Sequence, residues 1–205
     1  MYHEPEVFAA LRDRDLIGLK LLVKDDCVND YHPRSGLTLL YLACAFNSVE
    51  AVKLLLHNPN IDVNRGGIDR EPPLLATSNI DIIKLLFVQP GFDPNRCNKH
   101  YMKTALYEAC YFGNVELVKL LLSHPNIDCN QSECDGGNTP LIVTCRNISQ
   151  LDRPTDYITI IKLLLAHPNI NIYKKNFYNE TAVDMCDSDN DNCQQVINII
   201  KTHSV

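Results

Sequence analysis

The stretch Thr104–Asn130, TALYEACYFGNVELVKLLLSHPNIDCN, predicts the fold of the whole chain. It contains two short helical patterns joined by a tight turn at Gly113, and it ends in a loop that begins at a proline. Nearly the same text, TLLYLACAFNSVEAVKLLLHNPNIDVN, occupies Thr38–Asn64. The two copies start 66 positions apart, which is two periods of 33 residues. A period of this length, made of helix, turn and helix, predicts a stack of repeated helix pairs.

This repeated sequence resembles the ankyrin-repeat family, and the resemblance covers nearly the whole chain. The family's inner helix opens with Thr-Pro-Leu-His; Thr139-Pro140-Leu141 is near to that pattern, whereas Thr38-Leu39-Leu40-Tyr41 lacks both the proline and the histidine. The resemblance implies an all-α solenoid of stacked helix–turn–helix units with short β-turn or hairpin-like tips. It also implies one ankyrin-repeat domain over residues 1–205. Six units are expected, at about 1–32, 33–66, 67–98, 99–133, 134–175 and 176–205, with the first and last as caps.

Individual residues support this reading of the repeats. Thr38, Ser48 and Asn114 stand where a helix should begin, and their side chains can accept from the free N–H groups of the first turn. Cysteine recurs at one position of three inner helices, where a small buried residue is expected and a free thiol packs as a small hydrophobe. These cysteines are Cys44, Cys110 and Cys145.

Two units depart from the regular length. The third lacks three residues between its helices, so its inner helix should lose nearly one turn and leave a notch around Ala76–Asn79. The fifth has eight extra residues within about Asn147–Asp156, and its polar text with Pro154 predicts a surface loop. Insertions in repeat arrays often lie on the binding face.

Composition excludes several classes of function. The chain is 45% hydrophobic and 21% charged, which is typical of a globular protein. Its net charge of −6 argues against binding to nucleic acid or to an anionic membrane. No apolar run is long enough to span a bilayer, and the first residues lack the pattern of a secretory signal. The nine cysteines are therefore expected as reduced thiols in the cytoplasm.

No catalytic motif appears, so we expect neither an enzyme nor a cofactor. One alternative is a metal or enzyme site built on Cys97, His100, Cys129 and Cys134, since thiolates and imidazole are the ligands that zinc prefers. Another is a spacer, or a fragment of a larger scaffold, with no partner of its own.

The family resemblance implies protein or peptide recognition through the concave face and the loop tips, by a chain expected to be monomeric. Aromatic residues are concentrated at these positions, in a chain with only 7% aromatic residues, and aromatic side chains are favoured at interface hot spots. Tyr41 and Tyr107 are expected to lie inward instead. The predicted partner-binding residues are Phe46, His100, Tyr101, Lys103, Tyr111, Phe112, Arg146, Asn147, Phe177 and Tyr178.

Overall fold

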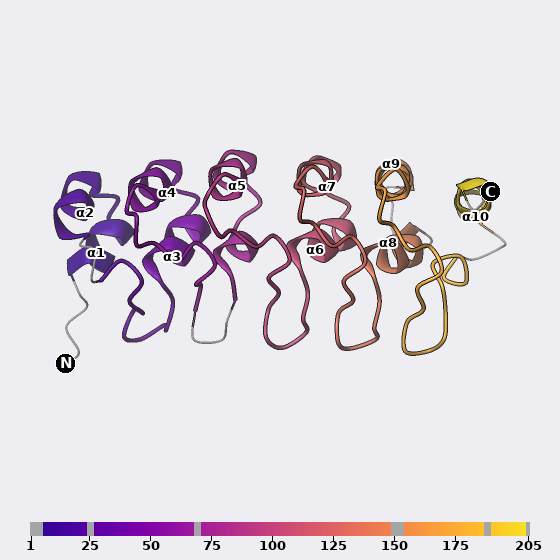
Figure 1. Ribbon diagram of the computed structural model, residues 1–205, viewed down its shortest axis with the longest axis horizontal. Helices are drawn as coiled ribbons and strands as arrows, with labels where there is room; N and C mark the ends of the chain where they lie inside the picture. The colour runs from indigo at the N-terminus through magenta and orange to yellow at the C-terminus, as the bar shows by residue number, and fades with distance from the viewer. Residues whose placement is uncertain (1–5, 24–26, 68–70, 149–153, 187–189, 204–205) are drawn as a thin grey trace. The chain divides into compact units, whose positions relative to one another are not determined.

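The computed structural model describes residues 6–23, 27–67, 71–148, 154–186 and 190–203 (Figure 1). Within these ranges the chain is built from helices, and the only β-structure is a pair of isolated bridges, Tyr31–Thr38 and Leu37–Gly67. The chain divides into two compact units, Met1–Lys99 and His100–Val205. The fold is the all-α ankyrin solenoid that the repeats predicted.

The first unit stacks three successive helical layers. Its inner row consists of α1 (Glu6–Arg12), α3 (Leu39–Ala45) and the single 3₁₀ turn η1 (Pro73–Ala76). Its outer row consists of α2 (Leu16–Leu22), α4 (Val49–Leu56) and α5 (Ile80–Phe87). Figure 1 shows the two rows, and α3 packs against α1, α4 and η1. Each layer therefore buries its apolar side against its neighbours.

The second unit repeats this arrangement. The inner helices α6 (Ala105–Tyr111) and α8 (Pro140–Ile148) pack against each other, and so do the outer helices α7 (Val115–Leu122) and α9 (Pro154–Leu165). The last helix, α10 (Asp191–His203), packs against α8 and α9. The inner-helix cysteines Cys44, Cys110 and Cys145 are all buried, as their position predicted.

The predicted helix caps are confirmed. Thr38 Oγ1 accepts from the Tyr41 N–H at 3.2 Å, and Asn114 Oδ1 accepts from the Leu117 N–H at 3.1 Å. Ser48 caps α4 in the same way. These bonds satisfy N–H groups that a helix leaves without an internal partner, so they fix where each helix begins.

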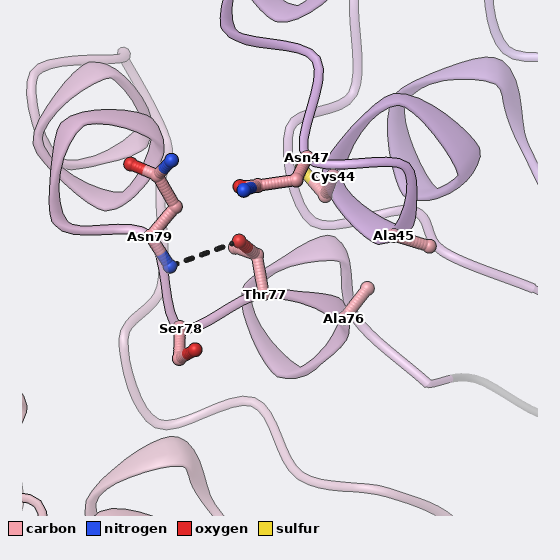
Figure 2. Close-up of a pocket in the computed structure, with 7 residues that line it drawn as sticks. All are labelled: Cys44, Ala45, Asn47, Ala76, Thr77, Ser78 and Asn79. Carbon is pink, nitrogen blue, oxygen red and sulfur yellow. Dashed lines mark hydrogen bonds between the residues drawn. The ribbon is translucent and has the colours of Figure 1, made fainter.

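The three-residue deletion has the consequence that the sequence predicted. Its inner helix is reduced to η1, and the chain then runs extended through Thr77 to the cap of α5 at Asn79. A cavity of about 270 Å³ opens here, lined by Thr77, Ser78 and Asn79 together with the end of α3 (Figure 2). The missing turn thus leaves a notch beside Cys44, Ala45 and Asn47.

Asparagine side chains join successive layers at the loops that follow the outer helices. Asn64 Nδ2 donates to the Gly91 carbonyl at 2.7 Å, and its Oδ1 accepts from the Asp93 N–H at 2.9 Å. Asn29 bonds Asn60 and Asp62 in the same two-sided way. Asn130 does the same with Asn169 and Asn171. Each of these asparagines holds the next loop through both its donor and its acceptor.

Candidate functional site

The candidate site lies on the unit His100–Val205, where helix α6 ends in two exposed aromatic residues. Tyr111 is the last residue of α6, and Phe112 is its C-cap. Their rings meet edge to face with centroids 5.0 Å apart, and Phe112 is 69% exposed. An exposed pair of aromatic rings offers a large apolar area that costs little conformational entropy to bury.

The backbone beneath this pair is held firmly. The Tyr111 carbonyl accepts from Asn147 Nδ2 at 2.8 Å and from the Tyr157 hydroxyl at 3.0 Å. Gly113 follows with a left-handed φ of +71°, and a β-carbon at this position would lie 3.2 Å from the Tyr157 ring. The two bonds supply partners for a carbonyl at the helix end, so the Tyr111 backbone is fixed by residues of α8 and α9.

The preceding loop tip folds over the same helix. Lys103 places its ammonium 5.1 Å from the ring centroid of Tyr101, 5.7 Å from that of Tyr107 and 5.6 Å from that of Tyr111. Its Nζ also lies 4.0 Å from the Glu108 carboxylate. A cation within about 6 Å of an aromatic face is attracted by the ring quadrupole. The loop tip and α6 therefore contact each other around Lys103. We call the three rings near its ammonium the tyrosine cluster (Tyr101, Tyr107 and Tyr111).

Burial raises the pKa of Tyr107, the middle residue of the tyrosine cluster. Tyr107 is 3% exposed, as predicted, and its pKa is raised to about 12. Desolvation is the main cause, and the Glu133 carboxylate adds to it, while the Arg146 guanidinium acts in the opposite direction. Tyr107 therefore keeps its proton to a higher pH than an ordinary tyrosine, whose pKa is 10.0. Tyr41, its counterpart in α3, is only half-buried and donates to Glu71 at 2.8 Å.

The tip of the next repeat is built around one buried carboxylate. Glu133 Oε1 accepts from the N–H groups of Gly136 and Asn138, both at 2.9 Å, and from Asn138 Nδ2 at 2.9 Å. Burial acts to raise the pKa of Glu133, but these bonds and one from the Asp135 N–H hold it below its usual value. The ionised carboxylate thus fixes the shape of the tip.

Hydrogen bonds connect the three tips of this unit. The Cys134 N–H donates to the Tyr101 carbonyl at 2.9 Å. The Phe177 N–H donates to the Gly136 carbonyl at 2.9 Å, and Asn176 Nδ2 donates to Asn138 Oδ1 at 3.1 Å. Phe177 and Tyr178 are 70% and 72% exposed on the last tip. The predicted aromatic residues at the tips are therefore held on one hydrogen-bonded framework.

One predicted site residue, Asn147, does not have the exposure expected for it, and three others remain at least partly exposed. The prediction of Asn147 as an exposed contact is wrong, since it is 5% exposed and its amide is used in the bond to Tyr111. Arg146 is half-buried, and His100 is exposed. Phe46 is exposed but belongs to the unit Met1–Lys99, as the C-cap of α3. The surface described here therefore lies on the second unit, and it combines predicted residues with Tyr107 and Glu108, which were not predicted as contacts.

The loop predicted at Asn147–Asp156 is also partly wrong. Helix α8 has nine residues where α3 and α6 have seven, so it continues through Asn147 to Ile148. Helix α9 already begins at Pro154, a residue that suits a first helical turn because its missing N–H has no partner there. The middle of the insertion, 149–153, lies outside the described residues.

Two cysteines of the alternative metal site have other partners within the second unit. Cys129 is buried and its Sγ lies 3.3 Å from His167 Nδ1, while Cys134 Sγ donates to the His100 carbonyl at 3.3 Å. Cys97 belongs to the other unit. In the part of the chain that the structure describes, no three His, Cys, Asp or Glu side chains gather closely enough to hold a metal ion.

Sequence reasoning did not find two groups that shape the site, Glu133 and Tyr157. Glu133 looked like an ordinary charged loop residue, although the glycines at 136 and 137 signal a tight tip that needs acceptors for its N–H groups. Tyr157 lies just after the insertion, and the sequence gives no signal for its bond to a carbonyl 46 positions earlier.

Comparisons with known proteins agree with this architecture. A family model described as ankyrin repeats in three copies matches residues 74–176, and a model of the single ankyrin repeat matches residues 35–65. No curated protein matches the chain. None of the described helices combines the length and apolar character that crossing a bilayer requires.

Solved structures show the same fold. The crystal structure of EF0377, an ankyrin repeat protein, is 24% identical with a TM-score of 0.80, and the match covers 98% of each chain. The ankyrin repeat domain ABAYE2397 from Acinetobacter baumannii AYE is 20% identical with a TM-score of 0.77, over 98% of this chain and 97% of that one. Ankyrin repeats are generally non-catalytic protein–protein interaction modules. By its matched repeats and by its fold, this chain belongs to the ankyrin-repeat family.

Proposed function

We propose that the chain is a non-catalytic recognition module that binds a protein or peptide through the exposed aromatic surface of its second unit. Residues 1–205 then form one ankyrin-repeat domain of six repeats. The centre of the binding surface is Tyr111 and Phe112, and the tip residues Tyr101 and Lys103 flank it. His100, Arg146, Phe177 and Tyr178 belong to its polar and aromatic surroundings.

The observation that carries this proposal is the fixed presentation of exposed aromatic rings. The carbonyl of Tyr111 is held by two side-chain bonds, and the tips on either side are tied by backbone bonds. A surface that is already ordered loses little entropy on binding, so more of the contact energy appears as affinity. Large aromatic side chains in such a position are typical hot spots.

The charge of the chain favours one type of partner. With a net charge of −6, the protein attracts segments that combine basic and apolar residues. Tyr111 and Phe112 would bury the apolar residues of the partner. The half-buried Glu108 carboxylate, which lies 4.0 Å from Lys103 Nζ, would attract a basic residue of the partner. Phe46 is a separate candidate contact on the first unit, beside the notch that follows α3.

The test is differential affinity capture from the source cell, followed by titration of the captured protein. A Tyr111→Ala/Phe112→Ala variant should lose the partner, and each single substitution should weaken binding by about 1–3 kcal/mol if it removes a hot spot. Tyr173→Ala is the matched control, because Tyr173 is 66% exposed in the same unit but lies in the turn after α9. Circular dichroism must show that all variants are equally folded.

Equal capture by the wild type and the double variant would contradict this site. Phe46→Ala then tests the first unit with the same assay. Capture of nothing by any form would favour the alternative that the chain is a spacer without a partner of its own.

A further inference from the structure

The three rings of the tyrosine cluster surround a single ammonium group. Lys103 Nζ lies 5.1, 5.7 and 5.6 Å from the centroids of Tyr101, Tyr107 and Tyr111, and the nearest Glu108 oxygen is 4.0 Å away. Each ring is within the distance at which a cation is attracted to an aromatic face. Three aromatic faces and one carboxylate around a cation make a cage for an ammonium ion, and in the free protein its occupant is the chain's own lysine.

The walls of this cage are unequal in exposure. Tyr107 is buried within α6, and the Tyr111 backbone is fixed by Asn147 and Tyr157. Tyr101 stands on the tip and is 53% exposed, and it follows an exposed His100. The cage is therefore closed on the side of the helix and open to solvent on the side of the tip.

The occupant lies near solvent. Lys103 is half-buried, and its ammonium sits at the end of a four-carbon chain that can turn outward into water. An unmodified ammonium is compact and strongly hydrated, so it gains little by staying between aromatic rings. A methylated ammonium sheds water more readily and fills more of the space, which is why aromatic cages recognise quaternary ammonium groups.

We propose that Tyr101, Tyr107, Tyr111 and Glu108 form a binding site for a methylated or quaternary ammonium group, and that this group displaces Lys103. Lys103 then acts as an internal competitor that keeps the cage closed to ordinary lysine side chains. The proposal deepens the proposed function, on which it rests for the presence of a partner at this surface. The binding of the cation itself is testable without that partner.

The experiment is a titration of the full chain with acetyl-trimethyllysine amide, followed by NMR of the tyrosine ring protons. The wild type should bind the probe, and Lys103→Ala should bind it about tenfold more tightly, because the competitor has gone. Tyr111→Leu should remove binding in both backgrounds. Lys99→Ala is the matched control, since it removes the same charge from an exposed position in the same loop.

Two further comparisons complete the test. One distinguishes attraction to a cation from burial of apolar surface, and the other distinguishes a peptide ligand from a small-molecule ligand. The neutral compound 3,3-dimethylbutan-1-ol has the shape of choline without its charge, and it should bind at least about tenfold more weakly than choline. Tighter binding of a trimethyllysine peptide than of choline identifies a methylated protein as the source. The reverse order identifies a free choline-like ligand.

Three results would overturn the proposal. These are no binding to the wild type at saturating probe, equal affinities for Lys103→Ala and Lys99→Ala, or equal binding of the neutral compound. Capture of a partner that depends on Tyr111 and Phe112, combined with any of these results, would leave the proposed function standing while the cage fails. Binding of the cation without any captured protein would support the cage and contradict the proposed function.

Discussion

Three glycines have nearly the same left-handed φ and differ in what surrounds them. Gly91, Gly113 and Gly137 have φ of +73°, +71° and +73°. A β-carbon at Gly91 would meet nothing within 4 Å, whereas one at Gly113 would lie 3.2 Å from the Tyr157 ring. Tyr157 is 2% exposed and donates to the Tyr111 carbonyl, so it has little room to yield.

We therefore expect Gly113→Ala to destabilise the protein more than Gly91→Ala. Both substitutions force an L-residue into the left-handed region, at a cost of about 1–2 kcal/mol. Gly113→Ala adds crowding against Tyr157, for about 1 kcal/mol or more. Urea denaturation measures both free energies of unfolding. Equal losses would mean that Tyr157 moves aside, and the bond that supports Tyr111 would then be weaker than its geometry indicates.

At the scale of single residues, sequence reasoning succeeded where the cause is local. Thr38 and Asn114 are predictable as caps because the N–H group that a cap bonds lies only three residues further along the sequence. Asn147 was misplaced because its position was copied from shorter helices. The insertion lengthens α8 by two residues relative to α6, and this turns Asn147 toward the Tyr111 carbonyl instead of the solvent.

At the scale of the elements, Asn29, Asn64 and Asn130 each join two successive layers at a loop. Asn64 bonds Gly91 and Asp93, which lie 27 and 29 positions further along the chain. The recurrence of such asparagines was visible in the sequence, but their partners belong to the next repeat, so only the structure reveals their role. The notch after α3, in contrast, was predictable, since counting residues between two matched helices is enough to find a missing turn.

We predict that Asn64→Ala destabilises the protein by about 1–3 kcal/mol, because it removes two hydrogen bonds that join adjacent layers. Asn60→Ala is the matched control, since Asn60 is exposed in the same loop and contributes only its backbone carbonyl to the joint. Hydrogen exchange of the Asp93 amide reports the local effect, because that N–H loses its acceptor. Unchanged exchange at Asp93 would show that water replaces the asparagine without cost.

At the scale of the whole molecule, the sequence determined the fold because one pattern is repeated, and each repeat confirms the others. It could not determine the site in the same way. The tyrosine cluster depends on where the Lys103 side chain turns, and the sequence predicts Lys103 only as a contact residue of the tip, not as the centre of three rings. Exposed aromatic residues were found by position, but the cage they form with Glu108 is a property of the folded tip and helix together.

The buried thiols of both units lead to a prediction about alkaline pH. Burial raises the pKa of Cys44 in the first unit and of Cys110 in the second to about 12, from a usual value of 9.0. Between these two values the unfolded chain releases the thiol protons while the folded chain retains them. The free energy of unfolding should therefore be insensitive to these groups below pH 9. Above it, stability should fall by up to about 1.4 kcal/mol per pH unit for each thiol.

Urea denaturation at pH 8, 9, 10 and 11 in the presence of a reductant measures this decline. The Cys44→Ala/Cys110→Ala variant should lose some stability at pH 8 but decline less steeply above pH 9, because the two titrating groups are absent. Burial also raises the pKa of other groups, among them Tyr107 and Cys129, so part of the slope should remain. Parallel curves for the variant and the wild type would mean that the thiols reach water in the native state. The core of each unit would then be more open at its inner helices than the burial of Cys44 and Cys110 indicates.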